Sequence, residues 1–206
     1  MLPYDTVALF ALMARYNATW WPVVLVLLGL GGAALALAWR RRGHRLIAVV
    51  LAAGWLWVGA VYHLQHMATL NFMAPLYGVV WLVQGAALSA LAVTDGWRAG
   101  TAPALCRRAG LALALIALFG FPLAARWSGA PWAAVPLVGT APDPTAVFTI
   151  AILLTGTGRA LPLIWLVPVA WAVVAGLSAH LLRFWPDLLV PLAALGAVLA
   201  LARRRR

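Results

Sequence analysis

Two histidines, His63 and His66, are the residues whose spacing could most directly do chemistry. They are three residues apart, so on a helix their imidazoles share one face, about one turn from each other. Two such imidazoles can bind zinc, copper or nickel, and His180 or an aspartate could complete the ligand set. His63 and His180 on facing helices could instead hold a b-type haem. The candidate metal ligands are therefore His63, His66 and His180, with haem or a transition metal as the candidate cofactor.

Two other interpretations of these histidines stay open. Histidines at the ends of membrane helices also hydrogen-bond to water, lipid head groups or loops, or they line a polar vestibule for a solute. Other polar side chains are expected at the same ends of the helices. Gln84 is instead isolated in mid-membrane, where it either bonds to another helix, as interhelical glue, or lines a cavity. The candidate solute-binding residues are Tyr62, His63, Asn71, Gln84, Asp143, Thr145 and Thr149.

Several classes of chemistry lack the residues that they need. The chain has no lysine, which excludes a retinal Schiff base, and its four acidic residues are dispersed aspartates with no glutamate. GxSxG, Walker A and HExxH motifs are absent. The single cysteine, Cys106, cannot form an internal disulfide or a CxxC motif. We therefore predict no catalytic residue and no enzymatic activity.

The elements that must position these residues are apolar helices. The sequence is 66% hydrophobic and only 9% charged, too apolar for a soluble domain. Apolar runs of membrane-spanning length predict an all-α, polytopic bundle of seven spans in one domain, residues 1–206. Residues 4–16, after Asp5 as a helix cap, predict a short interfacial helix. The spans are expected at residues 20–39, 46–66, 74–93, 106–125, 144–158, 161–182 and 186–202, with a proline-rich loop at 126–143.

The arginines indicate the orientation of these spans. Twelve of the fifteen fall in clumps between alternate spans or at the C-terminus: residues 40–45, 98–108, Arg159 and 203–206. By the positive-inside rule this distribution predicts the N-terminus outside and the C-terminus inside a bacterial-type inner membrane. The formal charge of +11 then indicates anionic phospholipid rather than nucleic acid as a partner. The expected lipid-contacting residues are Arg203, Arg204, Arg205 and Arg206.

Short sequence patterns add a family resemblance. They are Tyr16-Asn17 followed by Trp21-Pro22, then Trp55-Leu56-Trp57-Val58-Gly59 running to Tyr62-His63, and Asp143-Pro144-Thr145 leading to Phe148-Thr149. Together they resemble an uncharacterised bacterial family of small polytopic inner-membrane proteins, known as a domain of unknown function. The resemblance implies an integral membrane location and no established activity. The family pattern usually has cysteine where this chain has Asp143, so the resemblance implies no thiol chemistry at this position.

Three functions remain as expectations from the sequence. The first is a multi-pass membrane protein that binds or passes a small solute through an outer-facing polar mouth. The second is a non-catalytic membrane subunit that packs against a partner protein or another copy of itself. The third is a haem- or metal-binding membrane protein that uses the outer-face histidines.

Overall fold

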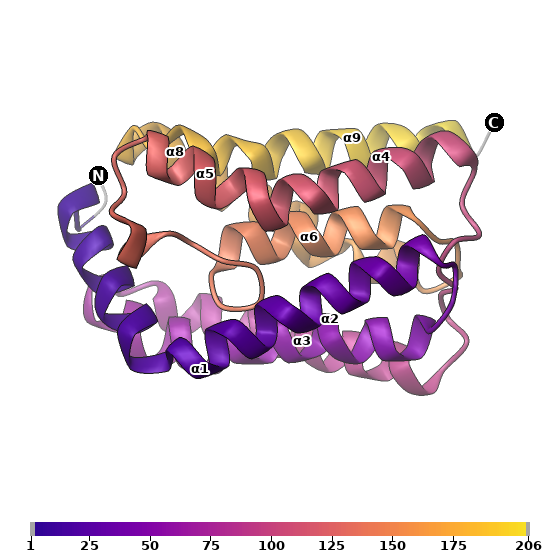
Figure 1. The fold of residues 1–206 in the computed structure, drawn as a ribbon, viewed down its shortest axis with the longest axis horizontal. Helices are drawn as coiled ribbons and strands as arrows, with labels where there is room; N and C mark the ends of the chain where they lie inside the picture. The colour runs from indigo at the N-terminus through magenta and orange to yellow at the C-terminus, as the bar shows by residue number, and fades with distance from the viewer. Residues whose placement is uncertain (1–2, 205–206) are drawn as a thin grey trace.

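The chain folds into an all-helical bundle, as the hydrophobic pattern predicts (Figure 1). The computed structural model describes residues 3–204, and side chains for residues 3–200. In this part of the chain only an isolated bridge between Arg98 and Thr157 has strand-type pairing. The helices are α1 (Thr6–Trp39), α2 (His44–Trp57), α3 (Ala74–Val93), α4 (Ala104–Leu115), α5 (Phe121–Trp127), α6 (Pro142–Leu154), α7 (Leu161–Ile164), α8 (Leu166–Leu182) and α9 (Leu189–Arg204). Two π-helical segments, Val58–His66 and Ile116–Gly120, and three 3₁₀ turns, Met67–Thr69, Trp132–Ala134 and Trp185–Leu188, join or extend them.

Five helical stretches of the described chain are long and apolar enough to cross a membrane: Thr6–Trp39, His44–Thr69, Ala74–Val93, Ala104–Trp127 and Leu161–Leu182. Two shorter apolar helices, Pro142–Leu154 and Trp185–Ala200, complete the set. The third expected span, residues 74–93, coincides with α3. The structure thus has the helices of a membrane protein, while the count of seven crossings stays a prediction.

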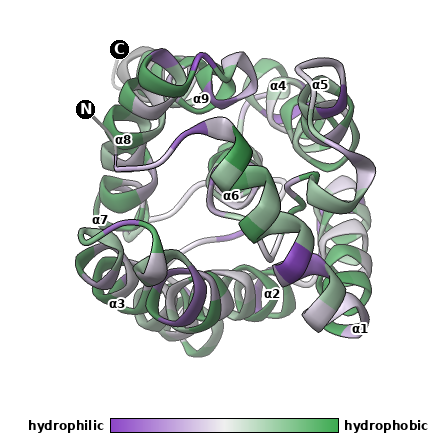
Figure 2. Cartoon of the chain, turned by 90° about the vertical axis from the view of Figure 1, so that its left-hand side faces the viewer, coloured by the Kyte–Doolittle hydropathy of each residue, from purple (hydrophilic) through white to green (hydrophobic). Residues whose placement is uncertain are grey.

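The short helix α6 occupies the centre of the bundle, with the other helices around it (Figure 2). Twelve of its 13 residues are buried, so it has no polar face to present to solvent. At 1.5 Å per residue it is about 20 Å long, shorter than the roughly 30 Å of a bilayer core. Because α6 is enclosed by protein, its length need not match the lipid.

The N-terminal region differs from the expected arrangement of a separate helix at 4–16 and a span from residue 20. The structure joins the two in the single helix α1, and Asp5 caps it by accepting a hydrogen bond from the amide of Ala8 at 2.8 Å. The backbone of Trp20 departs from helical geometry (φ −113°, ψ 18°), two residues before Pro22. Proline lacks an amide proton and crowds the preceding turn, which explains the kink. Residues 3–19, which precede the kink at Trp20 and are here called the N-terminal arm, cross one end of the bundle (Figure 1).

The second expected span, residues 46–66, is α2 followed by the π-helical segment Val58–His66. A π-helix has a wider turn than an α-helix and is frequent at functional sites. In this segment three consecutive side chains, Val61, Tyr62 and His63, are all buried. The π turn therefore carries two of the candidate polar residues into the interior.

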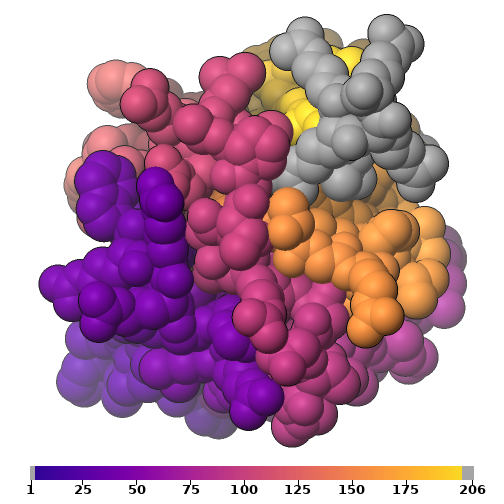
Figure 3. Space-filling model, turned by 90° about the vertical axis from the view of Figure 1, so that its right-hand side faces the viewer, coloured from indigo at the N-terminus to yellow at the C-terminus, as the bar shows by residue number. Residues whose placement is uncertain are grey.

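The opposite end of the bundle holds the connections α1–α2, α3–α4 and α6–α7, which meet in Figure 3. The α3–α4 and α6–α7 connections are joined by backbone hydrogen bonds. We call this junction the seam. Arg98 and Thr157 exchange N–H···O bonds of 2.9 and 3.2 Å, and the amide of Ala160 donates to Gly96 at 3.1 Å. A β-carbon on Gly156 would clash with the carbonyl oxygen of Arg98, so the backbones approach as closely as glycine allows.

The seam end is also the arginine-rich end. Its described arginines are Arg40, Arg41, Arg42, Arg45, Arg98, Arg107, Arg108 and Arg159. Asp95 forms ion pairs there with Arg45 and Arg98, at 3.8 Å each, and lies 3.5 Å from His44. The side chains of the four C-terminal arginines expected to contact lipid, Arg203 to Arg206, lie outside the described residues.

Candidate functional site

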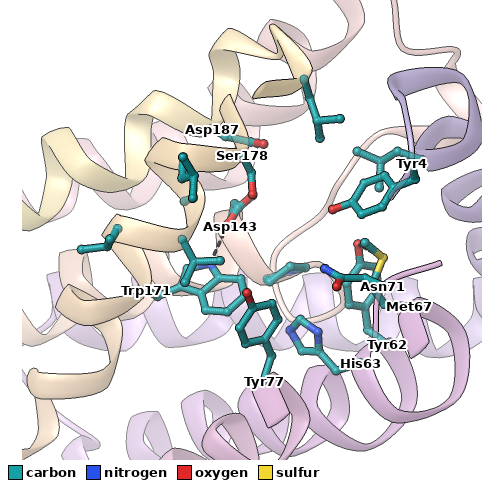
Figure 4. A pocket seen from close by; sticks show the side chains of 17 residues that line it. Tyr4, Tyr62, His63, Met67, Asn71, Tyr77, Asp143, Trp171, Ser178 and Asp187 are labelled. Atoms are coloured by element: carbon teal, nitrogen blue, oxygen red, sulfur yellow. Dashed lines mark hydrogen bonds between the residues drawn. The ribbon is translucent and has the colours of Figure 1, made fainter. Parts of the chain in front are cut away.

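A cavity of about 170 Å³ lies at the end of the bundle opposite the seam, under the N-terminal arm (Figure 4). Its walls combine aromatic, acidic and aliphatic side chains from six parts of the chain. They are Tyr4, Leu9, Tyr62, His63, Met67, Asn71, Tyr77, Pro142, Asp143, Trp171, Val173, Val174, Ala175, Leu177, Ser178, Leu182 and Asp187. We call this cavity the acidic–aromatic pocket.

His63 is the most unusual residue of the pocket. Its side chain is only 2% exposed, and neither ring nitrogen has a hydrogen-bond partner among the described residues. Aromatic rings of Tyr62, Tyr77, Trp81 and Trp171 surround it, with centroids 5.1 to 6.0 Å from its own. An unsatisfied buried polar group costs about 1–3 kcal/mol. A water molecule or a ligand in the pocket would remove that cost.

Two aspartates form the acidic side of the pocket. Asp143 lies in the first turn of α6 and Asp187 in the turn just before α9, and their carboxyl groups interact with each other. The indole N–H of Trp171 donates to Asp143 at 2.6 Å. The positive end of the α6 dipole favours a carboxylate at Asp143. Within the described residues neither aspartate has an ion pair with an arginine.

The rim of the pocket is formed by Tyr4 and Asn71. Burial, and next the negative field of Asp143 and Asp187, raise the pKa of Tyr4 to about 12, so its hydroxyl stays protonated at neutral pH. The Asn71 side chain interacts with this hydroxyl, and its Oδ1 accepts from the amide of Met73 at 2.9 Å. Asn71 thus links the arm to the start of α3.

Four of the seven solute-binding candidates line this pocket together: Tyr62, His63, Asn71 and Asp143. The other three, Gln84, Thr145 and Thr149, do not line it. Their side chains are engaged in structural hydrogen bonds, each with an identifiable cause.

Gln84 is interhelical glue, one of the two alternatives open from the sequence. Its Nε2 donates to the carbonyl oxygen of Ile164 at 2.8 Å. Pro168, four residues after Ile164, has no amide proton to give that carbonyl. The side chain of α3 therefore supplies the donor that the proline removed.

Thr145 and Thr149 stabilise α6 and its neighbours. Each hydroxyl donates to the carbonyl four residues earlier, at 2.6 and 2.8 Å. Thr145 also accepts from the amide of Gly139, and Thr149 from the indole N–H of Trp55, both at 2.8 Å. Their polar groups are thus satisfied without any ligand.

The three histidines do not form one site. Nε2 of His66 accepts from the indole N–H of Trp20 at 3.2 Å, and His180 is exposed on α8. Among the residues that the structure describes, no group of three or more His, Cys, Asp or Glu side chains could hold a metal ion. The pocket contains His63 without the other two candidates.

Several residues that line the pocket are not among the candidate site residues expected from the sequence: Tyr4, Tyr77, Trp171, Ser178 and Asp187. The sequence indicates that Asp187 could belong to a site, because it is one of few acidic residues and precedes an apolar run. Pairing it with Asp143 requires knowing that the starts of α6 and α9 adjoin, and no sequence spacing gives that. Tryptophan and tyrosine are common in membrane helices, so the sequence allows an aromatic-lined cavity but does not single out the rings that line it.

The fold and the pocket define an all-helical protein with several helices of membrane-spanning length and a cavity lined by acidic, aromatic and aliphatic side chains. A family model described as "Family of unknown function (DUF6064)" matches residues 6–206. The chain belongs to this family, which confirms the resemblance found in the sequence. No curated protein matches the chain, and no solved structure does.

Proposed function

We propose that this chain is a multi-pass inner-membrane protein that binds a small solute in the acidic–aromatic pocket from the outer side. The proposal has two parts: how the bundle lies in the membrane, and what the pocket does.

Seven crossings with the N-terminus outside are supported by the placement of charge. The eight described arginines of the seam end lie in or beside the connections α1–α2, α3–α4 and α6–α7, whereas Arg15, Arg126 and Arg183 lie toward the other end. Large apolar side chains such as Val83, Phe119 and Val173 are exposed on the helices around α6, as contact with lipid requires. In this orientation the seam faces the cytoplasm and the pocket faces outward.

Fusion reporters test the orientation. A reporter that works only in the cytoplasm should be active after Arg206, and one that works only outside should be active within residues 128–131. Activity of the outside reporter after Arg206 would overturn the seven crossings and the outward pocket together.

The observation that carries solute binding is the unpartnered, buried His63 in a cavity that both carboxyl groups also line. A cavity of about 150 Å³ is enough for a benzene molecule. The pocket, at about 170 Å³, therefore has room for a solute of roughly six to ten non-hydrogen atoms. Binding is favoured over passage, because the stacked rings of Trp55 and Trp81, 3.8 Å apart, lie buried in the bundle beside His63.

Ligand-dependent stability tests this function. A panel of small cationic, anionic and neutral solutes is added to the purified protein in lipid nanodiscs, and the unfolding midpoint is measured. A solute at 100 times its Kd should stabilise the protein by about 2.7 kcal/mol. His63→Phe, which keeps a ring and removes both nitrogens, should abolish this effect, while His180→Phe on the exposed face of α8 should not. Equal stabilisation of both variants, or of none of the proteins by any solute, refutes the proposal.

A further inference from the structure

The acidic–aromatic pocket has the chemistry of a site for a positively charged organic molecule, an inference that rests on the proposed function and specifies its ligand. The acidic groups of the pocket favour a cation as its occupant. Two interacting carboxyl groups in a site of low dielectric constant repel each other if both are ionised, so they require a proton or a cation between them. None of the three arginines toward this end, Arg15, Arg126 and Arg183, lines the pocket or forms an ion pair with a described residue.

The hydrogen-bond acceptors of the pocket also favour a cation. The carboxyl oxygens of Asp143 and Asp187 and the free ring nitrogens of His63 offer several acceptor positions. The indole N–H of Trp171 is already used by Asp143. An anion would meet two carboxyl groups and no arginine, whereas an ammonium group brings three N–H donors to these acceptors.

The aromatic wall of the pocket favours a cation as well. Tyr77 and Trp171 both line the cavity and meet edge to face, with ring centroids 5.4 Å apart. Aromatic faces attract cations within about 6 Å, and the effect grows when water is excluded. Because Trp171 also donates to Asp143, one side chain fixes the carboxyl group next to an aromatic surface.

The rest of the wall is aliphatic. Leu9 of the N-terminal arm and Val174, Leu177 and Leu182 of α8 also line the cavity. This surface suits a short hydrocarbon or aryl group rather than a second charge. A metal ion would use none of it, and the described residues contain no group of three ligands for one.

We propose that the pocket binds a small primary amine in its ammonium form, with the charged group between Asp143, Asp187 and His63 and a short apolar body against α8 and the arm. The two aspartates provide the charge selectivity, and the aliphatic wall limits the size of the body.

Three probes of matched shape test this inference: phenethylamine, 2-phenylethanol and phenylacetate. Binding to the full chain in nanodiscs is followed by the unfolding midpoint and by tryptophan fluorescence, to which Trp171 contributes. The amine should bind at least tenfold more tightly than the alcohol, and the carboxylate more weakly still. Calcium and sodium chlorides are tested alone; stabilisation by either salt with none by the amine assigns the site to a metal ion and overturns the inference.

Charge-removing variants locate the effect. Asp187→Asn and Asp143→Asn should each weaken amine binding roughly 10- to 100-fold and leave alcohol binding within a factor of about three. Asp143→Asn keeps an acceptor oxygen for Trp171. The matched control Asp95→Asn, at the seam end, should bind the amine like the wild type. If a variant fails to fold, the comparison of the three probes on the wild type decides alone.

Two outcomes separate this inference from the proposed function. If the alcohol binds as tightly as the amine and His63→Phe abolishes both, the pocket binds solutes and the cation inference is wrong. If none of the three probes binds the wild type, the inference is also wrong, and the wider solute panel then decides whether the pocket binds any solute.

Discussion

The bond between Gln84 and Ile164 provides a quantitative test of how a proline is accommodated inside a membrane helix. We expect Gln84→Met, which has nearly the same volume and no N–H donor, to leave the Ile164 carbonyl without its side-chain donor at 2.8 Å. An unsatisfied buried carbonyl costs about 1–3 kcal/mol, and measured interhelical bonds in membranes average about 0.6 kcal/mol. Because Gln84 is only 2% exposed, water cannot easily replace the donor. We therefore expect a loss of about 1–2 kcal/mol.

The second half of the cycle is Pro168→Ala. Alanine returns an amide proton four residues after Ile164, so the backbone itself can satisfy the carbonyl. In the Pro168→Ala background, Gln84→Met should then cost less than about 0.5 kcal/mol. The two substitutions are thus expected to be coupled by about 1 kcal/mol.

The assay is equilibrium unfolding in mixed micelles of a mild detergent and sodium dodecyl sulfate, followed by helical circular dichroism. All four members of the cycle are measured under one set of conditions. Additive free energies, with Gln84→Met equally costly in both backgrounds, would show that the proline does not create the need for Gln84. The control is Ser89→Ala, also on α3, whose hydroxyl donates to its own helix at Gly85, and it should show no coupling to Pro168.

Three further predictions concern packing and anchoring. Gly110→Ala should destabilise the protein by about 1–3 kcal/mol, because a β-carbon there would lie 2.5 Å from the carbonyl oxygen of Ala151. The control Gly29→Ala, whose β-carbon would have nothing within 4 Å, should not destabilise it. Equal unfolding midpoints of the two variants would contradict the close approach of α4 and α6. Tyr16→Phe should cost about 1–3 kcal/mol, since its hydroxyl donates to the Thr140 carbonyl at 2.9 Å and accepts from the Trp57 indole at 2.7 Å; an unchanged midpoint would show that water replaces it. Replacing the four C-terminal arginines with alanine should weaken anchoring of the last span at the anionic leaflet by about 1 kcal/mol per arginine, so that a C-terminal reporter shows mixed orientation; uniform orientation would show that the upstream arginines suffice.

The helices could be predicted from the sequence because apolar length alone marks them. Residues 74–93 form α3 with the expected ends, and Asp5 caps α1 as its position suggests. The sequence predicts an interfacial helix at 4–16 apart from a span at 20–39, whereas the structure joins them in one helix with a kink at Trp20, two residues before Pro22. What hydropathy could not give is that a kink bends a helix without ending it.

The pocket could be predicted only in part, because polar residues in membrane helices have two kinds of use. The cavity is lined by four of the expected residues, Tyr62, His63, Asn71 and Asp143. Thr149 is also a polar residue in an apolar helix, but its hydroxyl forms hydrogen bonds within the bundle. The difference depends on partners that are distant in the chain, here Trp55. The pairing of Asp143 with Asp187 depends likewise on two helix starts meeting across the bundle.

The seam has a consequence for exchange with the two compartments. At that end the α3–α4 and α6–α7 connections are joined by backbone hydrogen bonds, and their backbones touch at Gly156. Side-chain movements alone therefore cannot open a path between them. At the other end the pocket is covered by an arm that contacts it through side chains such as Tyr4 and Leu9. A solute bound as proposed would therefore leave by the route through which it entered. Occupancy of the pocket would then depend on the solute concentration on the outer side alone.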